Sequence, residues 1–205
     1  MNKNILAFIC ISLLVFGASQ AFGGQGSYVG AGIGINLLND SDVSNSPGSE
    51  IAYDPGIALG LTLGYDYGCV RMEGEIGYLK NDIDETTASG ITTDYGGDVE
   101  TWCFMLNLLY DFEMNTAFTP YAGGGIGFAQ VDMNDLSFGA FSIGNDDDTV
   151  FAYQVQLGIG YAVSDTLMLD VNYRYFVTDD ANLDESGLEI DYNSHKLSAG
   201  MRLSF

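Results

Sequence analysis

The sequence predicts an all-β protein, an eight-stranded antiparallel up-and-down transmembrane β-barrel, from three observations. Eight segments alternate between apolar residues and polar or small ones, the period-two signature of strands with one apolar face. The links between these segments are alternately short and long. The apolar face is uniform, large and aromatic, whereas the other is small and charged, so we expect the apolar face to point outward into lipid.

The first two expected strands are Ser27–Leu38 and Gly56–Tyr67. In the first, valine, alanine, isoleucine and leucine at positions 29 to 37 alternate with three glycines and an asparagine. In the second, isoleucine, leucine and tyrosine at positions 57 to 65 alternate with alanine, glycine and threonine. Both segments therefore have one apolar face and one face of small residues.

The third and fourth expected strands are Val70–Lys80 and Val99–Glu113. The third alternates apolar residues with Arg71, Glu73 and Glu75. The fourth carries tryptophan, phenylalanine, leucine and tyrosine at even positions from 102 to 112, opposite a cysteine, an asparagine and an aspartate. Aromatic residues near strand ends suit the two membrane–water interfaces.

The second half of the chain repeats the pattern. The expected strands are Thr119–Met133, Thr149–Val163, Thr166–Thr178 and Ser194–Phe205. The first of these is rich in glycine, and we predict that Ala122, Ile126 and Phe128 point outward. The other three alternate leucine, valine, tyrosine and phenylalanine with glutamine, glycine, serine and charged residues.

The connections predict which end of the barrel is which. Short links follow Asp66, Glu113 and Ser164, whereas the four long, polar links are Asn39–Pro55, Asn81–Asp98, Asn134–Asp148 and Asp179–Asn193. Short turns at one end and long loops at the other are typical of a barrel threaded through a membrane. A water-soluble barrel such as a lipocalin would place its polar face outward. Of the 28 acidic residues, 21 lie in or beside the long links.

The face opposite the apolar one carries charges of both signs. We call these residues the charge network: Arg71, Glu73, Glu75, Asp111, Asp170, Arg174, Lys196 and Arg202. An eight-stranded barrel is too narrow for an open aqueous pore, and its interior is filled by side chains. Unpaired ions there would be costly, so salt bridges and hydrogen bonds are expected across the lumen.

The composition excludes some classes of protein. The 205 residues include 28 acidic and 6 basic side chains, for a formal net charge of -22. Nucleic acid is excluded as a partner because neutralising phosphates requires a basic face. Disorder is disfavoured because 47% of the residues are hydrophobic and 13% are aromatic.

Residues 1–21 are predicted to be a secretory signal peptide, followed by one barrel domain at residues 22–205. Lys3 supplies a positive charge, Ile5–Ala18 is apolar, and small residues precede the expected cleavage after Ala21. The apolar run is too short to favour spanning a membrane.

Several segments resemble one known family. They are YVGAGIG in the first strand, PYAGGGIGFA in the fifth, the LGIGYAVSDTLMLDVNYRY hairpin and the terminal HKLSAGMRLSF. Together they resemble the small eight-stranded outer-membrane β-barrel family of Gram-negative bacteria, which includes the transmembrane domain of outer membrane protein A and the opacity-type surface antigens. The chain ends at strand eight, so the peptidoglycan-binding domain of outer membrane protein A is not expected.

The resemblance implies a location and partners. The location is the Gram-negative cell outer membrane, with termini in the periplasm and the long loops outside. The implied surroundings are outer-membrane lipid and lipopolysaccharide. The aromatic terminus Phe205 looks like the assembly signal that the barrel assembly machinery reads in the C-terminal strand. An extracellular or host ligand would meet the loops.

Other motifs are interpreted as structural. The clusters Gly30–Gly34 and Gly123–Gly127 lack the spacing and following helix of a nucleotide-binding loop. His195, the single histidine, shares its face with Leu197 while the neighbouring serines point the other way, so no nucleophile–base pair is expected. No catalytic residue and no cofactor are therefore predicted.

The acidic runs and the cysteines give two more predictions. Asp146–Asp148 and Asp179–Asp180 lack the spacing of a known calcium motif and are interpreted as solvated loops. Cys69 and Cys103 lie at opposite ends of neighbouring strands, roughly 25–30 Å apart at about 3.3 Å per residue, so both are predicted to be free thiols.

Three classes of function remain open from the sequence. In order of preference they are a surface structural or interaction protein of the adhesin or antigen type, a narrow porin for small solutes, and an outer-membrane lipid-modifying enzyme. A lumen filled by the charge network favours the first, because it would block passage.

Overall fold

The computed structural model describes residues 26–38, 41–42, 50–88, 91–94, 98–134, 137–138, 141–142, 146–179, 181–183, 188–190 and 193–205. These residues form eight long strands and several short ones. The long strands are β1 Ser27–Leu38, β4 Gly56–Asp66, β5 Val70–Ala88, β7 Asp98–Asp111, β8 Phe118–Asn134, β11 Asp146–Ala162, β12 Leu167–Thr178 and β15 Asn193–Ser204. The described residues contain no α-helix long and apolar enough to cross a membrane.

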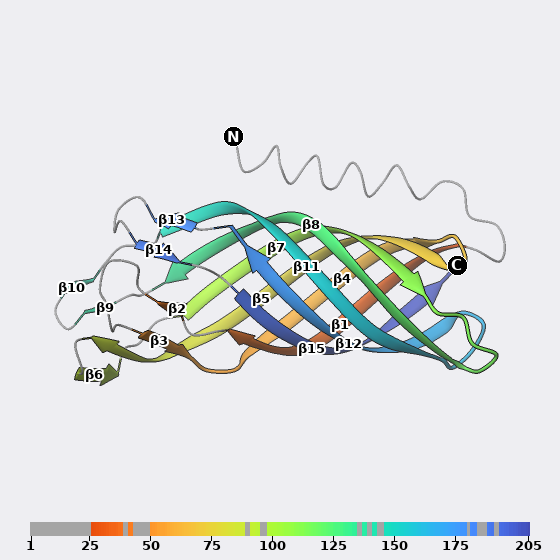
Figure 1. Ribbon diagram of the computed structural model, residues 1–205, viewed down its shortest axis with the longest axis horizontal. Helices are drawn as coiled ribbons and strands as arrows, with labels where there is room; N and C mark the ends of the chain where they lie inside the picture. The colour runs from red at the N-terminus through yellow and green to blue at the C-terminus, as the bar shows by residue number, and fades with distance from the viewer. Residues whose placement is uncertain are drawn as a thin grey trace.

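Each long strand pairs antiparallel with the next long strand along the chain, from β1–β4 through to β12–β15. The last strand then pairs with the first, from Tyr28 opposite Ser204 to Leu38 opposite Ser194. This pairing closes the sheet, and Figure 1 shows the strands wrapping around one axis with a strong tilt. The predicted eight-stranded antiparallel barrel is confirmed.

The two ends of the barrel differ. The chain crosses between neighbouring strands in tight turns at Tyr67–Cys69 and Val163–Thr166, near the C-terminus in Figure 1. The opposite end carries the short strands, which are β2 Ser41–Asp42, β3 Glu50–Tyr53, β6 Ile91–Asp94, β9 Ser137–Phe138, β10 Phe141–Ser142, β13 Ala181–Leu183 and β14 Leu188–Ile190. We call these ends the short-turn end and the long-loop end.

Part of the segment predicted as polar loop is strand. β5 continues to Ala88 and β11 already begins at Asp146, so both reach into the links predicted at 81–98 and 134–148. β3 and β6 pair with this extension of β5. The prediction ended these strands too early because it required an apolar face, whereas a backbone ladder beyond the lipid needs only hydrogen-bonded partners.

The outward face is the apolar one, as predicted. Ile33 of β1 and Leu61 of β4, for example, expose 62% and 63% of their surface. The residues on either side of each in the chain are glycine or threonine and face the lumen. In the glycine-rich β8, Ile126 and Phe128 are exposed and Ala129 is fully buried. The predicted parity of this strand is therefore correct.

The lumen has two layers, which the sequence analysis did not predict. The layer toward the short-turn end is polar and contains the charge network. The layer toward the long-loop end contains a cluster that we call the apolar plug, made of Ala58, Leu79, Val99, Cys103, Met105, Ala129, Val131, Val150, Ala152 and Phe176. Buried polar residues lie beside it, namely Asn36, Asn81, Thr101, Thr178 and Ser194. The lumen is therefore not polar throughout, because toward the long-loop end apolar side chains from β4, β5, β7, β8, β11 and β12 pack on one another beside the polar ones.

Candidate functional site

The charge network is the most distinctive feature of the lumen, and Arg71 lies at its short-turn end. The Arg71 side chain is 1% exposed. Its Nη1 donates to Glu73 Oε1 at 2.8 Å, and its Nε donates to Asp111 Oδ2 at 2.7 Å. The guanidinium also lies 4.7 Å from the centre of the Tyr121 ring. One cation thus pairs with two buried carboxylates.

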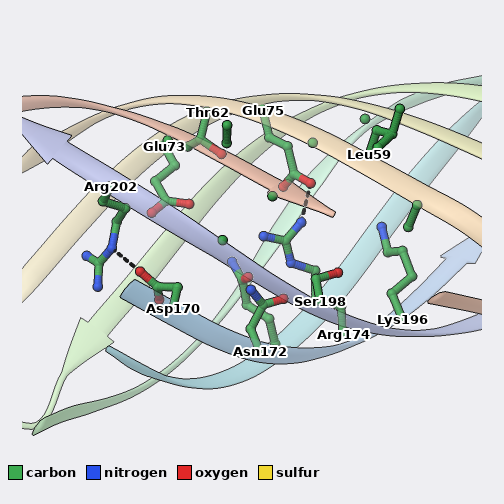
Figure 2. Close-up of a pocket in the computed structure, with 18 of the residues that line it drawn as sticks. Leu59, Thr62, Glu73, Glu75, Asp170, Asn172, Arg174, Lys196, Ser198 and Arg202 are labelled. Atoms are coloured by element: carbon green, nitrogen blue, oxygen red, sulfur yellow. Dashed lines mark hydrogen bonds and ion pairs between the residues drawn. The ribbon is translucent and has the colours of Figure 1, made fainter. Parts of the chain in front are cut away.

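Glu75 is the centre of the middle level. Arg174 Nη1 donates to Glu75 Oε1, and this ion pair crosses the lumen from β12 to β5 (Figure 2). The other carboxylate oxygen accepts from Asn107 Nδ2 at 2.8 Å and from Gln154 Nε2 at 3.0 Å. Because Gln154 also donates to Asn107 Oδ1 at 2.8 Å, three strands are linked around one carboxylate.

Asp170 pairs with Arg202, whose Nε donates to Asp170 Oδ2 at 2.5 Å (Figure 2). Lys196 behaves differently from the other basic residues of the lumen. It is 3% exposed, and its Nζ donates to the neutral Gln154 Oε1 at 3.4 Å. The structure places all eight residues of the charge network on the lumen face, and ion pairs join seven of them, with Lys196 outside those pairs.

Two tyrosines complete the network and were missed by the sequence analysis. Tyr28 donates its hydroxyl hydrogen to Glu73 Oε1 at 2.6 Å, and its ring lies over Gly64 of the neighbouring strand. Tyr121 lies over Gly158 in the same way, and Arg71 stacks on its ring. A tyrosine opposite a glycine in the adjacent strand would have indicated both residues. Which residues lie opposite one another depends on the strand register, however, and the sequence does not show the register.

A cavity of about 60 Å³ lies beside the charge network. On one side it is bounded by the glycine-rich inner faces of β1, β4 and β15, and on the other by side chains of β5, β11 and β12. Figure 2 shows Glu75, Arg174 and Lys196 directed toward this space from different strands. The cavity is too small for a substrate of metabolite size.

His195 lies on the outer face, as the alternation predicts. Its Nδ1 is hydrogen-bonded to the Tyr173 hydroxyl at 2.6 Å, and its ring stacks on that tyrosine. Ser194 is fully buried on the lumen side. The neighbouring serine therefore cannot reach the imidazole, and no nucleophile–base pair forms there.

The cysteines and the acidic runs were also singled out from the sequence. Cys69 is exposed and Cys103 is buried, and both are free thiols, as predicted. Within the described part of the chain, no group of three or more potential ligands could hold a metal ion. The side chains of Asp146–Asp148 and the residue Asp180 lie outside what is described, as do residues 1–21.

Comparison with known proteins places this barrel in a family. The sequence matches the model of the outer membrane protein beta-barrel domain over residues 8–205. Outer membrane protein PagN of Salmonella typhimurium is 26% identical over 202 residues, which cover 84% of this chain and 83% of PagN.

Solved structures show the same fold. Neisserial surface protein A superposes with a TM-score of 0.61 at 21% identity, covering 90% of this chain and 100% of that protein. OprG from Pseudomonas aeruginosa superposes with a TM-score of 0.57 at 16% identity, covering 89% of this chain and 99% of OprG. The chain therefore belongs to the outer membrane protein beta-barrel domain family, and it is an integral protein of the Gram-negative outer membrane.

Proposed function

We propose that this protein is a sealed barrel that anchors acidic loops on the cell surface, where they bind a partner with a basic surface. The observation that supports the sealed barrel is the filling of the lumen. The charge network spans it at the short-turn end, and the apolar plug covers it at the long-loop end. Moving an ion through the plug would require desolvating it among buried hydrocarbon side chains.

The charge of the loops supports the nature of the partner. In or beside the four long links lie 21 of the 28 acidic residues, and none of the 6 basic residues lies within those links. A surface of one sign attracts a partner of the opposite sign and raises the association rate. The comparison with a neisserial surface protein is consistent with exposure at the cell surface.

Single-channel conductance tests the sealed lumen. The refolded mature protein in a planar bilayer is expected to give no steady openings, and Arg202→Ala is measured beside it. Steady openings whose conductance changes in Arg202→Ala would mean that the lumen is a pathway, and the narrow porin would replace the sealed anchor. Chemically altered lipid A after incubation with the pure protein would instead establish the lipid-modifying enzyme, a role that the separation of His195 from Ser194 disfavours.

Binding of a lysine-rich peptide to the protein in lipid nanodiscs tests the loop charge. The loop variant Asp54→Asn/Asp179→Asn removes two exposed acids of the long links and is compared with Glu113→Gln/Asp165→Asn, which removes two exposed acids at the short-turn end. The loop variant should bind about 2- to 30-fold more weakly, because each of the two lost ion pairs contributes about 0.2–1 kcal/mol. Equal weakening in both variants would reject the loops as the binding surface.

The processing and assembly of the chain are part of the same proposal. We propose that residues 1–21 are removed on export and that residues 22–205 form the mature barrel in contact with lipid and lipopolysaccharide. Phe205 is then the signal that the barrel assembly machinery reads. In the closed barrel the Phe205 N–H donates to Ser27 O at 3.1 Å, so the terminus lies at the seam between the first and last strands.

A further inference from the structure

Lys196 is a buried cation that pairs with no carboxylate of the described residues. Among the described residues its Nζ forms no ion pair with a carboxylate, and its one hydrogen bond, to Gln154 Oε1, is long at 3.4 Å. The Nζ also lies 4.4 Å from the centre of the Phe176 ring, which belongs to the apolar plug. An ammonium group carries three donors, so most of its hydrogen-bonding capacity is unused.

Two further hydrogen-bond donors lie beside Lys196 in the same row of residues across neighbouring strands. Gln156 of β11 is opposite Arg174 of β12, and Arg174 is opposite Lys196 of β15. Gln156 Nε2 and Arg174 Nε are both buried, and neither has a hydrogen-bond partner in the part of the chain that the structure describes. All three residues line the same cavity. Buried donors of this kind are costly unless something accepts from them.

The charge of this level is also unbalanced. Among the described residues, Glu75 is the one carboxylate in an ion pair with either Arg174 or Lys196, so the pairs of this level leave one positive charge over. Nearer the short-turn end, Arg71 and Arg202 face three carboxylates, and that level carries one excess negative charge. The two excesses lie in different levels of a narrow lumen, so the network as a whole is neutral while the Lys196 level is positive.

The wall opposite these donors leaves room for a ligand. Glycines at positions 77, 60, 32 and 200 form one continuous row across β5, β4, β1 and β15. A methyl group at Gly60 would come no closer than 3.9 Å to another atom, the Glu75 Oε1. The cavity of about 60 Å³ holds roughly four to six waters at about 10–15 Å³ each, so a halide ion fits with water beside it.

We propose that this cavity binds one small monovalent anion of halide size, which accepts hydrogen bonds from Lys196 Nζ, Gln156 Nε2 and Arg174 Nε. The anion neutralises the excess charge below the apolar plug. A spherical ion suits donors that converge from three strands, because it accepts from any direction. Water then serves the cavity's two unpartnered acceptors, Asp170 Oδ1 and Asn172 Oδ1, which lie nearer the short-turn end.

Bromide is the probe for this site. The protein is refolded and crystallised in sodium bromide, and anomalous diffraction is measured at the bromine edge. One peak is expected in the lumen within hydrogen-bonding distance of Lys196 Nζ and Gln156 Nε2. In Lys196→Met and in Gly60→Val, which fills the cavity from the opposite wall, the peak should be lost. Lys80→Met is the matched control and should keep it, since that lysine is exposed on the outer face.

Thermal unfolding measures whether the anion belongs to the folded state. At equal ionic strength, the wild-type midpoint should be higher in bromide than in gluconate, which is too large for the cavity, and Lys80→Met should behave alike. Gly60→Val should lose this difference in midpoint. Because it removes no charged group, it tests the proposal even where Lys196→Met fails to fold. Three results would overturn the proposal. They are a lumen that contains water and no bromide, a bromide peak that remains in Lys196→Met, and an unfolding midpoint that is the same in bromide and gluconate.

Discussion

Replacing Arg71 with methionine would remove the guanidinium that pairs with Glu73 at 2.8 Å and with Asp111 at 2.7 Å. Methionine keeps much of the volume of the side chain but none of its charge. Both carboxylates would stay buried in the lumen, where they are 5% and 6% exposed. Tyr28 would remain as a hydrogen-bond donor to Glu73, but no cation would remain in contact with Asp111 among the described residues.

The expected loss is about 3–5 kcal/mol in the free energy of unfolding, because removing one partner of a buried ion pair leaves an uncompensated charge. That is a large fraction of the roughly 5–15 kcal/mol that stabilises a typical folded protein. The triple variant Arg71→Met/Glu73→Gln/Asp111→Asn should recover part of the loss, since the two stranded charges are then removed as well.

Urea unfolding of the barrel in lipid vesicles measures this loss, with the heat-modifiable shift on gels as a second readout. Lys80→Met is the control, because Lys80 also pairs with two carboxylates, Asp98 at 3.1 Å and Glu100 at 3.0 Å. Its side chain is 40% exposed, so solvent screens those pairs and the effect should be much smaller. Equal losses in Arg71→Met and Lys80→Met would refute the assignment of burial as the cause.

Three further predictions concern glycine packing, thiol access and assembly. Gly64→Ala should lose about 1–3 kcal/mol, because its Cβ would overlap the buried tyrosine ring of β1, whereas Gly60→Ala has open space and should unfold like wild type; equal unfolding midpoints would contradict this packing. A polar maleimide should label Cys69 in the folded protein and Cys103 only after unfolding, as mass spectrometry would show; rapid labelling of both would mean that the plug opens. Deleting Phe205 should reduce the amount of heat-modifiable barrel in the outer membrane, and normal levels would reject the assembly signal.

Much of the fold could be predicted from the sequence because it depends on local alternation. A strand places successive side chains on opposite faces, so leucine and isoleucine at every second position of Gly56–Asp66 already indicate one face in lipid. The same alternation placed Arg71 and Glu75 in the lumen before any strand was paired with another. Eight such segments with alternately short and long links were enough to predict the closed barrel.

What the alternation could not predict is which lumen residues share a level. In the sequence, Phe176 and Leu79 are apolar residues at inward positions of otherwise polar strand faces. The tertiary structure brings them together in the apolar plug. The short strand β6 likewise forms only because β5 extends past the lipid and offers it a ladder. Such features depend on contacts between segments far apart in the chain.

The sequence by itself determined the eight long strands and their inward and outward faces, because these follow from a period of two along each segment. The closed barrel followed from eight such segments with alternating links, and the location in the outer membrane followed from the resemblance to a family. Only the tertiary structure decided that Arg174 meets Glu75 across the lumen while Lys196 meets no carboxylate among the described residues. The physical reason is register. Shear between neighbouring strands sets the height at which each inward side chain lies, and this height decides which charges are paired and which donors are left to bind a ligand.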